Sequence, residues 1–294
     1  MSHPTQPRRG GASRGEPRAS AGTPAKTYEG PARLNADGTD QDDWDDHWDK
    51  YGEAAKGNPA NDYRHAMVLK LLGPLPKGAV VLDIGCGQGQ FAVDLQETNP
   101  QASVFGVEYS AEGVKRARQL ADRQGVPAKF YERNLLEPVV RDAEQPPATH
   151  AVCSEVLEHV DDPVTLMRNA ATLLAPGAKV VVTVPGGPRS AFDKHIGHWR
   201  HFTAPLLHEV LTEAGFDVDR VLRTGFPFFN LYKLAVIARG EKLVQDMDHR
   251  EPGAHPSGLE KAVTRFFSRT FPMNRDDARL GWQLAAVAHV PLVS

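Results

Sequence analysis

Short apolar runs alternate with segments of helical periodicity along the middle of this chain. Strands are predicted at residues 79–83, 103–108, 129–133, 150–154, 179–184, 216–223 and 282–290. Helices are predicted between them, at 91–97, 112–122, 163–174 and 205–214. Gly215 follows the last of these helices as a C-cap signal. Strands that alternate with helices predict an α/β fold, with a seven-stranded, mostly parallel sheet and helices on both faces.

The segment 226–280 separates the sixth and seventh strands and is far longer than a simple connection needs. It holds two helix candidates, Phe229–Val244 and Leu259–Phe267, on either side of a polar stretch. We interpret the segment as a helical insertion that forms a lid or an interaction surface. Its aromatic residues from 226 to 232 are expected to pack in a core, with an apolar acceptor pocket or a lipid contact as the alternatives.

The N-terminal part of the chain divides into two regions. Residues 1–40 are rich in Gly, Pro, Ala, Ser and Arg and have almost no large apolar residues, which predicts a disordered tail. Residues 41–294 are expected to form one domain that begins with N-terminal helices within 41–76. Trp44 and Trp48, four positions apart, suggest one helix, and Asn61–Leu72 carries the apolar stripe of another.

Composition narrows the classes of protein and the partners. A hydrophobic content of 40% and a net charge of −3 over 294 residues fit a soluble globular protein without a general attraction to nucleic acid or anionic membranes. The two cysteines, Cys86 and Cys153, lie in apolar stretches and are expected to be buried thiols. Neither a signal peptide nor a membrane-spanning apolar run is found, so we expect a cytoplasmic protein.

A glycine loop follows the first strand, in the stretch Val-Leu-Asp-Ile-Gly-Cys-Gly-Gln-Gly that ends at Gly89. Asp83 stands at the end of the strand, and Gly85, Gly87 and Gly89 follow at alternate positions. Glycines permit a tight turn and let a ligand lie against the backbone. The spacing differs from the dinucleotide fingerprint G-x-G-x-x-G, and an acid beside the loop is poorly suited to a pyrophosphate. We therefore expect a cationic or amino-bearing ligand instead of a dinucleotide.

A second acid ends the second strand. Glu108 follows Gly89 by 19 residues, the spacing at which nucleotide-binding folds place a carboxylate for ribose hydroxyls. The glycine loop and Glu108 together predict a site for a nucleoside.

At this point the chain resembles a known family. The glycine-loop stretch and the later Gly-Val-Glu-Tyr-Ser resemble the first two motifs of class I S-adenosylmethionine-dependent methyltransferases. Three further stretches resemble the ubiquinone-biosynthesis-like, type 11/12 branch: Ser-Glu-Val-Leu-Glu-His-Val from Ser154, Gly-His-Trp-Arg-His-Phe-Thr from Gly197 and Leu-Thr-Glu-Ala-Gly-Phe from Leu211. The resemblance covers about residues 60–225 and the last strand. It implies a Rossmann-like sheet and identifies 41–294 as a methyltransferase domain.

The resemblance also implies how S-adenosylmethionine is bound. Asp83, Gly85 and Gly87 would lie near its methionine part, Glu108 would hold the ribose, and Tyr109 would flank the adenine. Where the family often has an acid for the adenine amine, this chain has Asn134, whose carbonyl can also accept. Arg64 would meet the cofactor carboxylate, with a surface arginine as the alternative. The full set of expected cofactor residues is Arg64, Asp83, Gly85, Cys86, Gly87, Gly89, Glu108, Tyr109, Asn134, Leu135 and Glu155.

Histidines and carboxylates after the fourth and fifth strands are the candidates for the chemistry. Glu155, Glu158 and His159 have the i, i+3, i+4 spacing of one helical face. With His198 they would bind Mg²⁺ or Mn²⁺, a set similar to that of small-RNA 2′-O-methyltransferases and of some quinone-pathway O-methyltransferases. The alternatives are a metal-free base and a purely structural role. The expected catalytic residues are His159, His198 and His201, and His195 is a further rival for the downstream position.

We therefore expect methyl transfer to oxygen of a small-molecule, saccharide or lipid-linked acceptor. A metal-dependent RNA 2′-O-methyltransferase is an alternative, which the lack of a broad basic surface disfavours. An aminopropyl transferase and a non-catalytic S-adenosylmethionine-binding module are the others. Peripheral membrane contact and the oligomeric state stay open.

Overall fold

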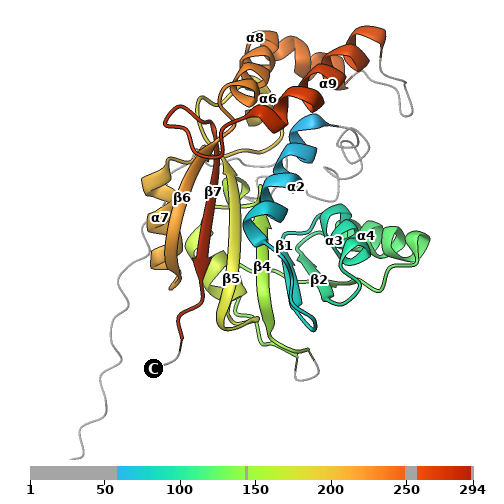
Figure 1. The fold of residues 1–294 in the computed structure, drawn as a ribbon, viewed down its shortest axis with the longest axis vertical. Coiled ribbons are helices and arrows are strands. Elements are labelled where there is room, and N and C mark those ends of the chain that lie inside the picture. Colours follow the sequence, from blue (N-terminus) through green and yellow to red (C-terminus); the bar gives the residue numbers. More distant parts are fainter. Residues whose placement is uncertain (1–57, 143–144, 249–256, 293–294) are drawn as a thin grey trace, which may run out of the picture.

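The computed structural model describes residues 58–142, 145–248 and 257–292. A seven-stranded sheet forms its centre, in the order β3-β2-β1-β4-β5-β7-β6 (Figure 1). Strands β1 to β5 pair in parallel, whereas β7 is antiparallel to both β5 and β6. This architecture confirms the predicted mostly parallel sheet. The strands are β1 Val80–Ile84, β2 Ser103–Glu108, β3 Lys129–Glu132, β4 Ala148–Ser154, β5 Leu174–Pro185, β6 Asp217–Thr224 and β7 Gln283–His289.

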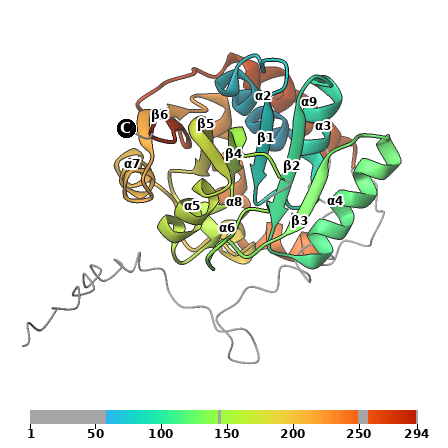
Figure 2. The ribbon, with the colours of Figure 1, turned by 90° about the horizontal axis from the view of Figure 1, so that it is seen from below.

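Helices cover both faces of the sheet because neighbouring strand residues point to opposite sides. In β1, Val81 packs in the core beneath α2 Pro59–Leu72, α3 Gln90–Thr98 and α4 Ala111–Gln124. The next residue, Leu82, packs in the core beneath α5 Pro163–Ala171 and α7 Ala204–Glu213 (Figure 2). These strands are therefore apolar on both faces, as buried parallel strands are.

Local sequence signals set the helix boundaries. Ser110 accepts a hydrogen bond from the backbone N–H of Gly113 and so caps the N-terminus of α4. Gly125 ends the same helix in the left-handed conformation. Asp162 caps α5 ahead of a proline, and Thr203 caps α7 in the same way.

A smaller helical layer stands at the C-terminal ends of the parallel strands (Figure 1). It consists of α6 Ala191–His195, α8 Phe228–Asp248 and α9 Gly258–Thr270, and short 3₁₀ turns occur at Leu157–His159 and Phe271–Met273. Phe229, Phe267 and Phe271 form a buried cluster against which Tyr63, Phe228 and Tyr232 pack. Core packing is therefore confirmed for Phe228, Phe229 and Tyr232, whereas Phe226 is not part of this cluster. Within the described ranges, no helix combines the length and apolar character needed to cross a bilayer.

Some expected boundaries were wrong, and others cannot be compared. The helix predicted to reach Leu174 ends at Ala171, because Leu174 pairs with Ala148 and begins β5. Helix α6 was not predicted. The predicted tail 1–40 and the helix with Trp44 and Trp48 lie outside the described residues.

Candidate functional site

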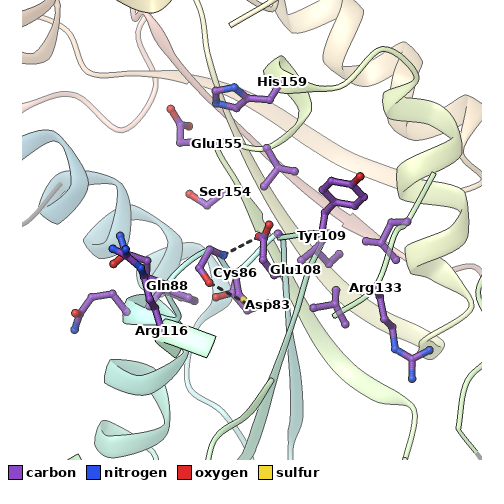
Figure 3. A pocket seen from close by; sticks show the side chains of 18 of the residues that line it. Asp83, Cys86, Gln88, Glu108, Tyr109, Arg116, Arg133, Ser154, Glu155 and His159 are labelled. Carbon is purple, nitrogen blue, oxygen red and sulfur yellow. Dashed lines mark hydrogen bonds between the residues drawn. The ribbon is translucent and has the colours of Figure 1, made fainter. Parts of the chain in front are cut away.

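A cleft of about 930 Å³ opens where β1, β2 and β4 end. Its walls come from these strand ends, from the glycine loop, from α2 and α4, and from the turn after β4. Figure 3 shows Glu155 and His159 at one end of the cleft, with Asp83 and Glu108 further along it. The carboxyl edge of a parallel sheet is where α/β proteins bind their ligands.

The glycine loop takes backbone conformations that only glycine adopts easily. Gly85, Gly87 and Gly89 have φ angles of 67°, 51° and 76°. The protein itself also fills the space beside two of them. A Cβ on Gly85 would stand 2.6 Å from a methyl of Val156, and a Cβ on Gly89 would stand 2.7 Å from Ala117. These two glycines are therefore fixed by φ and packing, before any ligand is considered.

Glu108 ties the loop to the end of β2. Its carboxylate accepts hydrogen bonds from the backbone N–H of Gly87 at 2.9 Å and of Ser110 at 3.0 Å. The side chain is buried yet borders the cleft. A carboxylate offers about four acceptor positions, more than these two bonds use. Glu108 can therefore accept hydroxyls as well as organise the loop.

Asp83 is the second buried acid of the cleft. Within the described part of the chain no side-chain hydrogen bond to it is formed, and only 5% of the residue is exposed. Burial, followed by the charge of Glu108, raises its pKa to about 8. The floor of the cleft is thus an acidic pair that a bound cation would stabilise in its charged form.

Another part of the cleft wall suits a flat ring. Tyr109 is 41% exposed, and both Tyr109 and Leu135 line the cleft. Asn134 accepts from the backbone N–H of Leu136 at 3.0 Å and donates to Glu137 at 3.2 Å. Cys86 also lines the cleft, and burial raises the pKa of its thiol well above the ordinary value. It is therefore not a nucleophile at neutral pH.

Glu155 does not share a helical face with Glu158 and His159, so that expectation was wrong. Its φ is 57°, and only the short 3₁₀ turn Leu157–His159 follows it. The carboxylate of Glu155 accepts from Thr183 at 3.0 Å and from Gln283 at 2.8 Å. Arg64 of α2 lies 3.6 Å from its other oxygen and completes this corner of the cleft.

Glu158, His159 and His198 bring one ligand atom each within 4.8 Å of one another. The residue Glu158 is fully buried, and neither of its carboxylate oxygens has a hydrogen-bond partner among the described residues. Burial and then the charge of Glu155 raise its pKa well above the ordinary value. The backbone N–H of Trp199 donates to the carbonyl of Glu158 at 2.8 Å, and this bond holds the loop that carries His198 against the 3₁₀ turn.

Two buried charged residues near His198, Asp193 and Lys233, were not found from the sequence. Asp193 of α6 forms a 2.7 Å ion pair with Lys233 of α8 and accepts from Ser190. The side chain of Asp193 also lies 3.9 Å from Nδ1 of His198 and 3.7 Å from Nε2 of His201. Ser190-x-x-Asp193 has the spacing of a capping box, which was the only sequence signal available.

Comparison with known proteins shows which family this chain belongs to. Residues 60–221, more than half of the 294, match the methyltransferase domain family. The chain belongs to that family. The ubiquinone biosynthesis O-methyltransferases of Alkalilimnicola ehrlichii and Xanthomonas axonopodis pv. citri are 31% and 33% identical over 177 and 190 residues, or 60% and 59% of this chain. The matched regions span 67% and 77% of those two proteins. The ubiquinone biosynthesis O-methyltransferase of Sodalis glossinidius is 35% identical over 135 residues, which are 45% of this chain and 51% of that protein.

Solved structures agree on the fold of the methyltransferase domain. Phosphoethanolamine N-methyltransferase 2 of Haemonchus contortus, in complex with S-adenosyl-L-methionine, gives a TM-score of 0.55 at 16% identity, over 86% of this chain and 61% of its own. The [4+2]-cyclase SpnF gives 0.55 at 20% identity, over 80% and 82%. A cyclase among these neighbours shows that the fold alone does not fix the reaction.

S-adenosylmethionine is the cofactor of the methyltransferase domain, and the cleft fits it. The acidic floor at Asp83 suits a ligand with a sulfonium and an amino group, Glu108 suits a diol, and the wall at Tyr109 suits a purine. Of the expected cofactor residues, all line the cleft except Gly89, which is the N-cap of α3. Of the expected catalytic residues, His159 borders the cleft, whereas His198 and His201 are not among the residues that line it.

Proposed function

We propose that this methyltransferase transfers the methyl group to a hydroxyl oxygen of a small molecule, and that the acceptor binds beside His159. The observation that carries the proposal is the position of His159 in the cleft wall, next to the Glu155 corner. The curated relatives, which are O-methyltransferases, support an oxygen acceptor. Among the acceptor classes expected from the sequence, those names favour a small or lipid-linked molecule over a saccharide, and within that class we propose a hydroxylated aromatic precursor of a quinone.

The chemistry divides between the cofactor and the chain. S-adenosylmethionine supplies an activated methyl group, which is displaced in line as the new carbon–oxygen bond forms and the carbon–sulfur electrons return to sulfur. Asp83, Glu108 and the glycine loop orient the donor. Arg64 and Glu155 close the corner between α2 and β4. What remains for the protein is to lower the cost of deprotonating the acceptor hydroxyl.

We infer that Glu158, His159 and His198 hold a divalent cation for that purpose. A fully buried carboxylate without a hydrogen bond is costly unless a proton or a cation compensates it, and two imidazoles converge on this one. When bound, a cation would lower the pKa of a coordinated hydroxyl, whose proton would pass to solvent water as the carbon–oxygen bond forms. Because Glu155 is excluded from the set, the ligands are two nitrogens and one carboxylate, which suit Mn²⁺ better than Mg²⁺.

The test is methyl transfer measured by mass spectrometry of the product. The purified protein is incubated with S-adenosylmethionine and, separately, a dihydroxybenzoate with an isoprenoid tail, a saccharide and a single-stranded RNA. We expect a methyl ether on the dihydroxybenzoate, loss of most turnover with EDTA, and recovery with Mn²⁺. Methylated RNA or sugar without methylated dihydroxybenzoate would overturn the acceptor assignment.

Two variants separate the cation from a metal-free base. Glu158→Gln is expected to remove the Mn²⁺ dependence together with most of the activity. Asp219→Asn alters a carboxylate beside a histidine far from the cleft and is the matched control. Full activity in EDTA combined with an inactive His159→Asn enzyme would contradict the cation and assign His159 as the base.

A further inference from the structure

A chain of three groups leads from the backbone to the inferred cation site. The ring nitrogen Nδ1 of His201 lies 3.1 Å from the carbonyl oxygen of Gly187. The nitrogen Nε2 of the same ring lies 3.3 Å from Nδ1 of His198. On the far side of the second ring, Nε2 of His198 lies 4.0 Å from a carboxylate oxygen of Glu158.

The chemistry of these groups fixes where the protons are. A carbonyl can only accept, so Nδ1 of His201 must carry a proton. The side chains of His198 and His201 are only 8% and 6% exposed, and the nearest carboxylate oxygens lie 3.7 to 4.0 Å away, beyond hydrogen-bond length, so neither ring has a partner that would hold it as an imidazolium. A neutral ring has one N–H, and therefore Nε2 of His201 is an acceptor. The group that donates to it is Nδ1–H of His198.

We propose that His201 is a positioning residue that holds His198 in the Nδ1–H tautomer and thereby presents the Nε2 lone pair of His198 to the cation site. The proposal rests on the inferred cation at Glu158, His159 and His198. A ligating imidazole needs an unprotonated nitrogen toward the cation, and the bond made by its other nitrogen selects the tautomer.

The surrounding charges do not compete for this proton. Asp193 lies 3.9 Å from Nδ1 of His198 and 3.7 Å from Nε2 of His201, both beyond hydrogen-bond length. Its carboxylate is instead engaged at 2.7 Å by Lys233 and by the backbone and hydroxyl of Ser190. The carboxylate that would otherwise accept from His198 is thus neutralised by α8, and His201 is left as the acceptor.

The first experiment reads the tautomer directly and needs no metal. In protein labelled with ¹⁵N-histidine, long-range proton–nitrogen correlation spectra in EDTA distinguish the Nδ1–H from the Nε2–H form of His198. We expect Nδ1–H in the wild type and in His201→Gln, whose amide oxygen stands near the position of Nε2. In His201→Asn the donor to Gly187 is kept but the acceptor is lost, so His198 should shift to Nε2–H. The same tautomer in all three proteins would overturn the proposal.

The second experiment measures Mn²⁺ binding by the loss of the free-ion electron paramagnetic resonance signal. His201→Asn is expected to weaken binding about 10–100-fold, the usual effect of removing an outer-shell partner, and His201→Gln by much less. The control is His289→Phe. His289 lies on β7 and contacts Asp219 away from the site, so this variant should leave the Mn²⁺ affinity unchanged. Equal affinities in Asn and Gln variants would overturn the positioning role.

The two readouts separate the proposals. If the wild type binds no Mn²⁺ but shows the Nδ1–H tautomer that His201→Asn abolishes, the cation is wrong and the tautomer control stands. If Mn²⁺ binds and the tautomer is insensitive to position 201, the cation stands and His201 has only a packing role.

Discussion

Asp83 and Glu108 are two carboxylates at the ends of neighbouring strands, and their surroundings give them different properties. Glu108 is held by two backbone N–H groups, whereas Asp83 has burial and a like charge beside it. One acid is therefore a fixed acceptor, and the other is an acid whose charge depends on what occupies the cleft.

The proposed role of Glu108 as the ribose acceptor predicts a loss of affinity in Glu108→Gln. Replacing one carboxylate oxygen by an NH₂ group should weaken S-adenosylmethionine binding by about 1–3 kcal/mol, the cost of losing hydrogen bonds to a charged acceptor. Calorimetric titration measures the affinity, and Glu209→Gln, at an exposed position of α7, is the control. Wild-type affinity in Glu108→Gln would remove Glu108 from the ribose site.

Asp83 predicts a pH dependence of stability in the cofactor-free protein. Its pKa is about 8 when folded and 3.8 as the unperturbed value, so the folded state keeps a proton that the unfolded state has lost. The free energy of unfolding should therefore fall as pH rises from 4 toward 8, by up to about 1.4 kcal/mol per pH unit. Above the folded pKa this dependence ends.

The comparison of wild type with Asp83→Asn isolates this effect. The histidines whose pKa values are lowered by burial occur in both proteins, so their titration cancels in this comparison. Urea unfolding at both values should show a smaller loss of stability in the variant. Identical slopes would mean that Asp83 is already ionised at pH 7.

Residues whose position follows from a strand end could be placed from the sequence, whereas residues that depend on distant contacts could not. Asp83 and Glu108 were placed at the edge of the sheet because each ends a predicted strand. Asp193 and Lys233 are 40 residues apart, and only the packing of α6 on α8 brings them together. No local pattern records such a pair.

At the scale of elements, Gly89 joins α3 to its neighbours. It caps α3 at a φ of 76°, and a Cβ there would meet Ala117 of α4 and Phe130 of β3 within 2.8 Å. Gly89→Ala should lower the free energy of unfolding by about 2–5 kcal/mol, from the left-handed backbone and overpacking together.

Gly125→Ala is the matched control for that substitution. Gly125 has a similar φ of 66°, but nothing stands within 4 Å of a Cβ at this position. Only the backbone term of about 1–2 kcal/mol should appear. Equal losses of unfolding free energy in the two variants would show that Ala117 and Phe130 move aside without a measurable loss of stability.

The turn after β4 shows where element prediction failed. The spacing of Glu155, Glu158 and His159 fits a helix, but Glu155 has a positive φ and the 3₁₀ turn is only three residues long. Tertiary bonds from Thr183 and Gln283 hold Glu155 in that conformation. Periodicity cannot detect a turn that is imposed by strands lying elsewhere in the sequence.

At the scale of the whole molecule, the cleft draws its walls from α2, α4 and the ends of β1, β2 and β4. A ligand there binds only the folded chain and should stabilise all of it. S-adenosylmethionine at one hundred times its Kd should add about 2.7 kcal/mol to the free energy of unfolding. NAD at the same concentration should add nothing in the same urea experiment. Stabilisation by NAD alone would contradict the cofactor assignment.

The order of strands in the sheet was less predictable than their number. Alternating elements indicated a mostly parallel sheet with helices on both faces, which is a local inference. The insertion of β7 between β5 and β6, in antiparallel register, depends on pairing between segments about 60 to 110 residues apart.

The bond from Gln283 to Glu155 has a consequence for synthesis. Glu155 shapes the corner of the cleft beside α2, and one of its two anchors is the first residue of β7. During translation the glycine loop, both acids and the histidines leave the ribosome well before this anchor does. The nascent chain therefore carries the residues that line the cleft but lacks one of the two hydrogen bonds that hold the Glu155 side chain until residue 283 has emerged.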